Sequence, residues 1–404
     1  MTTVTSDAAP HTDSVDCFQL SATSGSARAG IIHTAHGIVR TPVFMPVGTK
    51  ATVKATSVPE LLELSAQIIL GNTYHLVQRP GTQAIREAGG LHEFMHWPRP
   101  ILTDSGGYQV FSLRDTLQLD DAGATFQSVY DGSAITYTPE SVVEAQTDLG
   151  SDIAMVLDEC PPGDAPRDAV VRAVERTTAW ARRAREHHLL HRRSGADPWS
   201  RTGMPQLQFG IVQGGIHPDL REQSVSELLD IGFDGYAVGG LSVGESAELT
   251  MPALESATAL LPTGRPRYYM GIGDPVGVLD VIHRGVDMFD CVLPTRLGRT
   301  AAAMVPVECS PTARLNMRNA RHAQDDGPIL DGCGCFACIS GYSRRYIRHL
   351  FQQQEVLGLR LLTLHNLHVL ISLVARARRA ICSDTWDQFY AHERARWSPI
   401  GTSA

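Results

Sequence analysis

The sequence predicts an α/β protein built as a (β/α)8 barrel of the TIM type, with an inserted hairpin and a cysteine-rich C-terminal subdomain. Eight short apolar runs each end in a polar residue or a glycine. Most of the gaps between these runs are long enough for a helix, and a closed parallel barrel is built from eight such strand–helix units. A doubly wound open sheet, which also carries function at its strand ends, is the rival fold.

Each predicted strand is mostly apolar, as expected for parallel strands that are buried on both faces. The eight runs are residues 44–47, 68–70, 101–103, 153–157, 208–212, 236–238, 268–270 and 288–289. The clearest helix covers residues 167–188, where Val170, Val174 and Trp180 fall on one face at helical spacing.

Two stretches interrupt the alternation of strands and helices. Residues 106–138 are expected to contain a β-hairpin after the third strand, because the alternating residues 125–130 precede the turn pair Asp131-Gly132. Residues 191–206, rich in Arg, Ser, Gly and Pro, are expected to form a surface loop before the fifth strand. After Asp331 the composition shifts to Cys and Gly, and a long helical pattern covers residues 344–379.

The expected domain organisation is a disordered tail at residues 1–17, a catalytic barrel at 18–325, a metal-binding helical subdomain at 326–396 and a short tail at 397–404. Residues 1–15 are polar and do not resemble a secretory signal. No run of about 18 apolar residues suggests a membrane span. Eight cysteines without a signal indicate a reducing compartment, so we expect a cytoplasmic protein.

The charge balance excludes a protein that is coated in positive charge. The chain has 35 basic and 43 acidic residues, a net charge of −8. Any nucleic-acid site must therefore be a local basic patch of a few clustered arginines.

A metal site is predicted by Cys333-x-Cys335-x-x-Cys338, which is followed by a helix that bears histidines. Three thiolates and one imidazole form a closed tetrahedral set typical of structural zinc, which holds a fold together and does not activate water. Reduced thiols in a tight loop are the alternative, but free cysteines rarely cluster so densely. Spacing alone does not choose the fourth ligand among three histidines, His349, His365 and His368.

Polar residues at the strand ends form the candidate active site. Asp104 and Asp290 follow the third and eighth strands, where barrel enzymes carry their catalytic groups. One carboxylate can stabilise or attack the positive carbon of a breaking sugar–base bond, while a second group transfers the proton. The alternative is that each aspartate caps the next helix. Several polar strand ends together favour an active site over a set of helix caps.

Two further strand ends suit recognition of a purine-like edge. Asp158 can accept hydrogen bonds from ring N–H and amino groups, and the carboxamide of Gln213 can both donate and accept. Gly239-Gly240 offers backbone N–H groups, although turn glycines often have a purely structural role.

Four motifs and the Cys/His cluster together resemble the tRNA-guanine transglycosylases, also called queuine tRNA-ribosyltransferases. The motifs are DSGGYQ at residues 104–109, GIVQGG at 210–215, GGLSVGE at 239–245 and MFDCVLPTR at 288–296. The resemblance runs in order from about residue 18 to about residue 396. Each motif alone is modestly specific, whereas the set is highly specific.

The resemblance implies a pentosyltransferase that replaces guanine at the anticodon wobble position of tRNA through a covalent ribosyl–aspartate intermediate. Asp290 is then the nucleophile on C1′, Asp104 is the general acid/base, and one structural Zn²⁺ is held by Cys333, Cys335, Cys338 and His365. The base-binding residues it implies are Asp104, Ser105, Gly106, Gly107, Tyr108, Asp158, Gln213, Gly240, Leu241 and Met270. The RNA-binding residues it implies are Gly271, Ile272, Gly273, Asp274, Pro275, Val276, Gly277, Thr295, Arg296, Leu297, Gly298 and Arg299.

Cys160 and Val243 are similar to the bacterial branch of the family, which accepts 7-aminomethyl-7-deazaguanine and forms homodimers through the zinc subdomain. The implied acceptors are the tRNAs for Asp, Asn, His and Tyr, which carry GUN anticodons. Ser242 departs from the common alanine, and the loop at 191–206 is longer than usual. The rival functions are a barrel glycosidase or nucleoside hydrolase, which leaves the zinc subdomain unexplained, and a non-catalytic RNA-binding partner, which leaves the carboxylates unexplained.

Overall fold

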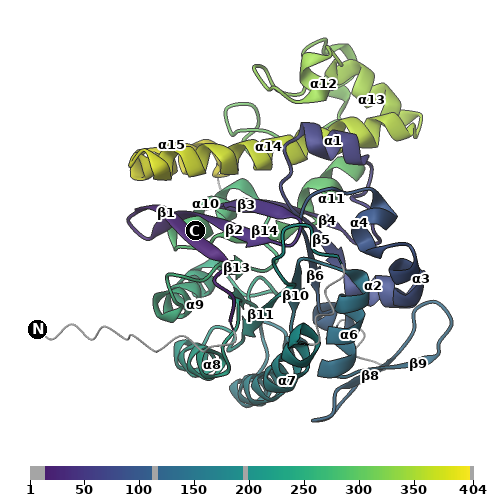
Figure 1. Cartoon of the computed structure of the whole chain (residues 1–404). Coiled ribbons are helices and arrows are strands. Elements are labelled where there is room, and N and C mark those ends of the chain that lie inside the picture. Colours follow the sequence, from purple (N-terminus) through teal and green to yellow (C-terminus); the bar gives the residue numbers. More distant parts are fainter. Residues whose placement is uncertain (1–13, 112–116, 194–198, 401–404) are drawn as a thin grey trace, which may run out of the picture.

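Eight parallel strands close into a barrel, as the sequence predicts (Figure 1). The computed structural model describes residues 14–111, 117–193 and 199–400. Around the barrel the strands are β10 (Ile153–Met155), β11 (Leu207–Val212), β12 (Gly235–Val238), β13 (Arg267–Tyr269), β14 (Met288–Cys291), β4 (Val43–Gly48), β5 (Ile69–Asn72) and β6 (Ile101–Asp104). The pairing of β6 with β10 closes the ring, and the open-sheet alternative is wrong.

Helices surround the barrel strands. They are α1 (Val58–Glu63), α2 (Thr73–Gln78), α3 (Thr82–Glu87), α4 (Gly90–Met95), α5 (Gly107–Phe111), α6 (Pro139–Leu149), α7 (Arg167–Arg193), α8 (Pro218–Ile231), α9 (Ala247–Leu260), α10 (Pro275–His283) and α11 (Leu293–Arg299). The predicted helix at 167–188 is α7, and it continues to Arg193. The surface loop expected from residue 191 therefore begins later, and its residues 194–198 lie outside the described part of the chain.

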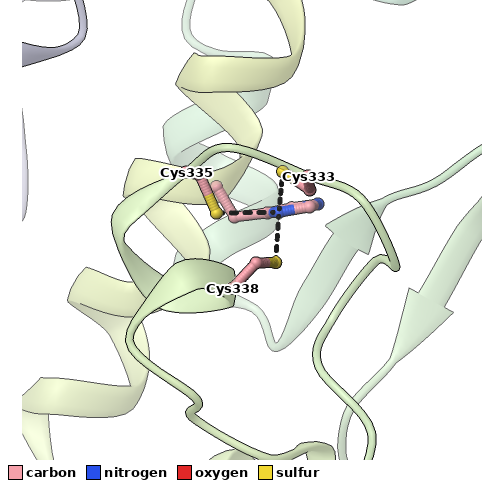
Figure 2. A group of neighbouring side chains, drawn as sticks. Cys333, Cys335 and Cys338 are labelled. Carbon is pink, nitrogen blue, oxygen red and sulfur yellow. Dashed lines mark hydrogen bonds between the residues drawn. The ribbon is translucent and has the colours of Figure 1, made fainter.

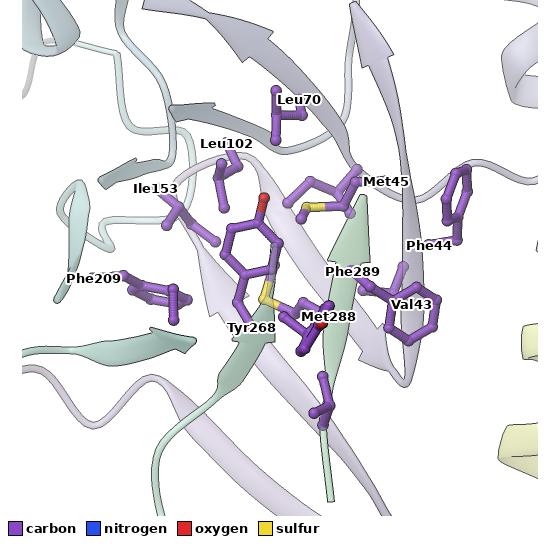
Figure 3. Packing of buried hydrophobic residues seen from close by; sticks show 14 of the residues in the cluster. Val43, Phe44, Met45, Leu70, Leu102, Ile153, Phe209, Tyr268, Met288 and Phe289 are labelled. Atoms are coloured by element: carbon purple, nitrogen blue, oxygen red, sulfur yellow. The ribbon is translucent and has the colours of Figure 1, made fainter. Parts of the chain in front are cut away.

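Side chains from several strands fill the barrel interior, as expected for eight strands. Leu102, Phe209 and Met288 are fully buried in this core, and Figure 3 shows them with Tyr268 among the strands. Tyr268 brings a hydroxyl into this apolar core, and that hydroxyl has a hydrogen-bond partner in the site described below. The core thus extends up to the strand end that carries Asp290.

The hairpin predicted after the third barrel strand is confirmed, and one more strand joins it to make a three-stranded sheet. β8 (Ala124–Gln127) pairs with β9 (Ala134–Tyr137), and β7 (Gln118–Leu119) pairs with β8. Phe126 and Tyr137 meet edge-to-face at 5.1 Å between ring centroids, and Phe126 also contacts Tyr74 on α2. This small aromatic core fixes the inserted sheet against the barrel.

The sequence analysis missed an antiparallel sheet that precedes the barrel. It consists of β1 (Phe18–Ser24), β2 (Ala27–Thr34) and β3 (Gly37–Thr41). The Arg28 guanidinium pairs with Asp287, just before β14, at 3.0 Å. Residues 14–17, expected in a disordered tail, are anchored too, because the Val15 N–H donates to Asp234 Oδ1 at 2.7 Å and Cys17 is buried. This segment covers the N-terminal end of the barrel.

The C-terminal part contains β15 (Ala302–Met304), β16 (Arg314–Asn316), the 3-10 helix η1 (Ala320–Gln324), α12 (Phe336–Ile339), α13 (Arg344–Gln352), α14 (Val356–Cys382) and α15 (Trp386–Trp397). The helical pattern predicted at 344–379 is two helices, separated where Gln354 adopts φ +59°. A small hydrophobic core extends from Ala301 to Leu362, on both sides of the domain boundary expected at 325, which stays a prediction.

Among the described residues, α14 alone is long and apolar enough to cross a membrane by length and composition. It contacts α11, β1, β2 and β4, and 61% of its most apolar window is buried. Figure 1 shows α14 lying along the barrel. Its apolar character is thus accounted for by packing, as in the core helix of a soluble protein.

Candidate active site and metal centre

Asp104 and Asp290 both lie at the carboxyl ends of barrel strands, where the sequence analysis expected them. Asp104 ends β6, and its carboxylate accepts from Asn72 Nδ2 at 2.7 Å and from the Thr73 N–H at 3.0 Å. Asp290 is on β14, and its Oδ1 accepts from the Tyr268 hydroxyl at 2.6 Å and from the Gly271 N–H at 3.1 Å. The Asp104 carboxylate thus meets α2, the helix after the neighbouring strand, and does not simply cap the next helix.

The electrostatics of the two carboxyl groups favour proton transfer near neutral pH. Burial raises the pKa of Asp104 to about 7, and the negative charges of Asp290 and Asp158 act in the same direction. Burial also raises the pKa of Asp290, while its bonds to Tyr268 and Gly271 oppose that shift. A carboxyl group with a pKa near 7 can both hold and release a proton under physiological conditions.

Asp158 and Gln213 form a buried polar pair at adjacent strand ends. Gln213 Nε2 donates to Asp158 Oδ2 at 2.7 Å, and burial raises the pKa of Asp158 to about 6. Gln213 Oε1 is buried and has no hydrogen-bond partner within the described structure. A buried acceptor without a partner is costly unless a ligand supplies the donor.

Glycines bring the backbone close to this polar pair. Gly240 has φ +64°, and a Cβ there would lie 2.2 Å from Gln213 Oε1. A Cβ on Gly107 would lie 2.6 Å from Asp158 Oδ1. Both positions therefore require glycine for steric reasons that the motif spacing alone does not reveal.

The other predicted base-binding residues surround these groups to different degrees. Ser105 is buried and its hydroxyl donates to Asp158 Oδ1 at 3.5 Å. Leu241 is also buried, whereas Tyr108 on α5 is 61% exposed. Met270 lies just after β13 and would be 3.5 Å from a Cβ on Gly239. The structure thus links Ser105 and Met270 to the Asp158–Gln213 neighbourhood, and the stacking roles of Tyr108 and Met270 stay predictions.

Ser242, the departure from the family pattern, has φ +60°, and its hydroxyl lies 2.8 Å from the Tyr269 hydroxyl. That hydrogen bond joins the 239–245 turn to β13. Its effect on base choice stays a prediction.

The predicted RNA-binding segments divide into structural and basic parts. In residues 271–277, the Asp274 carboxylate caps α10 by accepting from the Gly277 N–H at 2.8 Å, and a Cβ on Gly273 would collide with the Cys291 side chain at 2.3 Å. Arg296 and Arg299 lie on α11, where Arg299 Nε also donates to the Thr295 carbonyl.

Two lysines that the sequence analysis missed extend this basic region. Burial lowers the pKa of Lys54, and the positive charges of Arg299, Lys50 and Arg296 act in the same direction. Lys50 and Lys54 follow β4, which neighbours β14 in the barrel. The two lysines in the sequence GTKATVK, directly after a strand end, are the signal that could have indicated them.

Four side chains near the C-terminal end of the chain come together in a group that could hold a metal ion (Figure 2). The sulfur atoms of Cys333, Cys335 and Cys338 lie 3.7, 3.4 and 3.7 Å from His365 Nδ1. Tetrahedral zinc, with bonds of about 2.3 Å to sulfur and about 2.0 Å to nitrogen, separates such atoms by about 3.6 Å. Of the three candidate histidines, His365 is the one within this group.

The second nitrogen of His365 orients the ring for ligation. His365 Nε2 is 2.9 Å from the Met304 carbonyl oxygen, to which only an N–H can donate. The Nδ1 lone pair therefore faces the three thiols, as metal-bound histidines require. The four side chains can hold a metal ion and leave no position for a substrate.

Fold and site define a (β/α)8 barrel enzyme with carboxylates at its strand ends and a separate metal centre. A family model described as queuine tRNA-ribosyltransferase matches residues 22–399. The chain belongs to this family, which confirms the resemblance found in the sequence.

Curated relatives with the same description cover most of the chain. A queuine tRNA-ribosyltransferase of Desulforudis audaxviator is 52% identical over 369 residues, which are 90% of this chain and 94% of that protein. One of Acetivibrio thermocellus is 50% identical, covering 89% and 91%. One of Lysinibacillus sphaericus is 48% identical, covering 90% and 91%.

Proposed function

We propose that this protein is a tRNA-guanine transglycosylase that replaces guanine at the anticodon wobble position with 7-aminomethyl-7-deazaguanine, in queuosine biosynthesis. The observation that carries the proposal is the gathering of Asp104, Asp158, Gln213 and Asp290 at one end of the barrel, in two differently bonded sets. One set is suited to chemistry at the sugar and the other to recognition of the base.

Asp290 is the nucleophile. Tyr268 and Gly271 both bind its Oδ1, so the second oxygen is the one directed to ribose C1′. Attack forms a C1′–oxygen bond and breaks the bond from C1′ to guanine, which leaves as the neutral base with a proton donated by Asp104. The reacting carbon is reached when the wobble nucleotide is turned out of the stacked loop.

Asp104 is the general acid/base of the exchange. With a pKa of about 7, it is available in both protonation states near neutral pH. The incoming deazaguanine loses its ring proton to Asp104 and attacks C1′, and the bond to Asp290 breaks. Asn72 and Thr73 hold the Asp104 carboxylate for this transfer.

Asp158 and Gln213 recognise the purine-like edge of either base. With a pKa of about 6, Asp158 is ionised at neutral pH and accepts from the ring N–H and the amino group. Gln213 Oε1 and the Gly240 N–H provide a further acceptor and donor. Tyr108 and Met270 cover the two faces of the base. Cys160 and Val243, which match the bacterial pattern, leave room for the aminomethyl group.

The metal centre holds one structural Zn²⁺ through Cys333, Cys335, Cys338 and His365. A closed set of three sulfur ligands and one nitrogen ligand supplies folding energy and no catalytic water. No step of the exchange passes through the ion. Its contribution to function is indirect, through the packing of α14 on α11.

The acceptors are the tRNAs for Asp, Asn, His and Tyr. Lys50, Lys54, Arg296 and Arg299 form a local basic surface on a chain whose net charge is −8. Such a surface fits the phosphates around the anticodon loop, and the rest of the acidic molecule would not attract RNA. Residues 271–277, which include the Gly271 contact to Asp290, lie next to the same reacting centre.

A cytoplasmic homodimer is the working form. Large apolar side chains are exposed on both α12 and the start of α14, where Phe336, Ile339 and Val356 are 46%, 71% and 68% exposed. Exposed apolar surface of this kind is found at protein interfaces. We therefore place the dimer contact on α12 and the start of α14.

The experiment that tests the function measures incorporation of labelled guanine into unmodified tRNA with a GUN anticodon, with free guanosine as a parallel substrate. Label should enter the tRNA and guanosine should remain intact. Hydrolysis of guanosine without labelling of tRNA would instead establish the nucleoside hydrolase alternative.

A further inference from the structure

Two histidines and a glutamate meet on the outer helical layer, away from both the strand ends and the cysteine cluster. His187 Nε2 lies 3.2 Å from Glu144 Oε1, and His191 Nε2 lies 3.2 Å from His187 Nε2. The three ligand atoms are all within 4.8 Å of one another. Glu144 is on α6, and the histidines are on α7.

Helical spacing and a neighbouring ion pair hold this arrangement. His187 and His191 are one turn apart, so both rings project from the same face of α7, with centroids 4.8 Å apart. One turn earlier, Arg183 makes two hydrogen bonds of 2.8 Å to Glu140. That bidentate pair sets the register of α6 against α7 and brings Glu144 opposite His187.

The three atoms that meet are one carboxylate oxygen and two ring nitrogens, and each can present a lone pair. Without an ion, a proton on His187 Nε2 can be shared between Glu144 Oε1 and His191 Nε2. A cation at the same place would instead accept a lone pair from each of the three atoms.

We propose that Glu144, His187 and His191 form a second metal site, selective for a divalent transition metal such as Zn²⁺ or Ni²⁺. Ligand bonds of about 2.0–2.2 Å around a tetrahedral ion separate ligand atoms by about 3.4 Å. This is close to the 3.2 Å that separates His187 Nε2 from Glu144 Oε1 and from His191 Nε2. Two imidazoles and one carboxylate favour zinc, nickel or copper over magnesium and calcium, which prefer oxygen. Water completes the coordination, because three protein ligands leave a position open.

Occupancy of the site would join α6 to α7. Val142 of α6 and Trp180 of α7 belong to one buried cluster with Phe126 of the inserted sheet. An ion that binds only the folded protein stabilises it according to its concentration relative to the dissociation constant. Metal binding would therefore stabilise the packing of α6 on α7, the part of the barrel that supports the inserted sheet.

The test starts from protein that already contains one tightly bound zinc per chain. Ni²⁺ and Co²⁺ are added, and bound metal and melting temperature are measured. We expect one further equivalent, a rise in melting temperature, and a Co²⁺ spectrum without the sulfur charge-transfer bands of a thiolate site. His187→Ala and His191→Ala should each weaken this binding at least tenfold, and Glu144→Gln should weaken it less. His392→Ala, which removes an exposed histidine of α15, should change nothing.

The melting temperature of each variant before Ni²⁺ or Co²⁺ is added shows whether it folds normally. Since Glu144 is largely exposed, Glu144→Gln provides a variant that keeps the helix packing even if the histidine variants do not. Absence of a second equivalent in the wild type, or undiminished binding in the double His187→Ala/His191→Ala variant, would overturn the proposal. Neither result depends on base exchange.

Discussion

At the scale of single residues, Asp158 is a carboxyl group whose charged form is unfavourable in the free protein. Its carboxylate is buried beside Gln213, and burial raises its pKa from 3.8 to about 6. A buried ion is retained at such a cost where a ligand needs it. Sequence position suggested the residue, but the degree of burial and the pairing with Gln213 come from strands that meet only in the closed barrel.

Asp158→Asn should stabilise the free protein at high pH. Because the folded-state pKa is raised, the folded state holds a proton between about pH 4 and about pH 6 that the unfolded state has released. Wild-type stability therefore falls through this window, by about 3 kcal/mol in total, and the full cost is present at higher pH. The asparagine still accepts from Gln213 and carries no such cost.

Urea unfolding at about pH 4.5 and about pH 8 measures this effect. At the higher pH the variant should have a larger free energy of unfolding than the wild type. It should also bind the base poorly. An equal stability difference at both pH values would mean that Asp158 is not a strained carboxylate.

Gly240→Ala should damage base binding more than folding. The new methyl group would lie 2.2 Å from Gln213 Oε1 and displace the carboxamide, while the φ of +64° adds strain of about 1–2 kcal/mol. We expect KM for the base to rise about tenfold or more, equivalent to about 1.4 kcal/mol. Gly264→Ala, at a position with open space and no positive φ, is the matched control. Equal kinetics of the two variants would argue against a role for Gly240 in the site.

At the scale of elements, the metal centre is connected to the basic helix α11 through α14. His365 is followed by Asn366, whose Nδ2 donates to the Pro294 carbonyl at 3.0 Å and whose Oδ1 accepts from the Met304 N–H at 2.8 Å. A Cβ on Gly298 would lie 2.6 Å from Thr363 Oγ1. Close packing of this kind transmits a shift of α14 directly to Arg296 and Arg299.

Cys335→Ser should release the metal and loosen this connection. Cys335 is buried, and loss of one sulfur from a closed tetrahedral set weakens the whole site. We expect metal content to fall well below one per chain, and the melting temperature to drop by on the order of 5–10 °C. Affinity for tRNA should fall more than affinity for the free base.

The exposed Cys382, on the same helix as His365, provides the comparison through Cys382→Ser, which should keep the metal. Metal retention by the Cys335→Ser protein would show that the cysteine cluster does not hold the metal.

The elements differed in how well the sequence predicted them. The barrel strands were found because buried parallel strands are continuous apolar runs that end in polar residues. β1 to β3 were missed because polar residues and glycines interrupt their apolar residues, so that none of them forms a continuous apolar run. Their role, covering the barrel end, also depends on distant partners such as Asp287. The two turns at Gly25 and Gly37, with φ of +58° and +127°, were the available signal for this sheet.

The same contrast applies to the site. The strand-end aspartates were predictable from position and motif, whereas Tyr268 was not. Tyr268 is on the neighbouring strand β13, and its hydroxyl donates to Asp290 inside the barrel. Lys50 and Lys54 join Arg296 and Arg299 only because β4 pairs with β14 when the barrel closes.

At the scale of the whole molecule, the exposed apolar side chains of the metal-binding subdomain bear on assembly. Ile339→Asp places a charge on a side chain that is 71% exposed, so the monomer fold should be unaffected. If α12 forms the dimer contact, burying this charge without a partner is costly and the dimer should dissociate. Sedimentation of the wild type and of Ile339→Asp at equal concentration measures the change in the fraction of dimer.

Ile400→Asp, at a residue that is 68% exposed outside the subdomain, should leave the dimer intact. A dimer that persists in Ile339→Asp, or a wild type that is monomeric, would exclude this surface as the interface.

The central claim is that Asp290 holds the ribose of tRNA covalently after guanine has left and before the new base enters. Its most direct test is recovery of a covalent protein–tRNA adduct from denaturing gels, with the modified peptide identified by mass spectrometry, for the wild type and for Asp290→Asn. The account predicts an adduct on Asp290 in the wild type and none in the variant, which should still bind tRNA. An adduct on Asp104, or full exchange activity in Asp290→Asn, would contradict it.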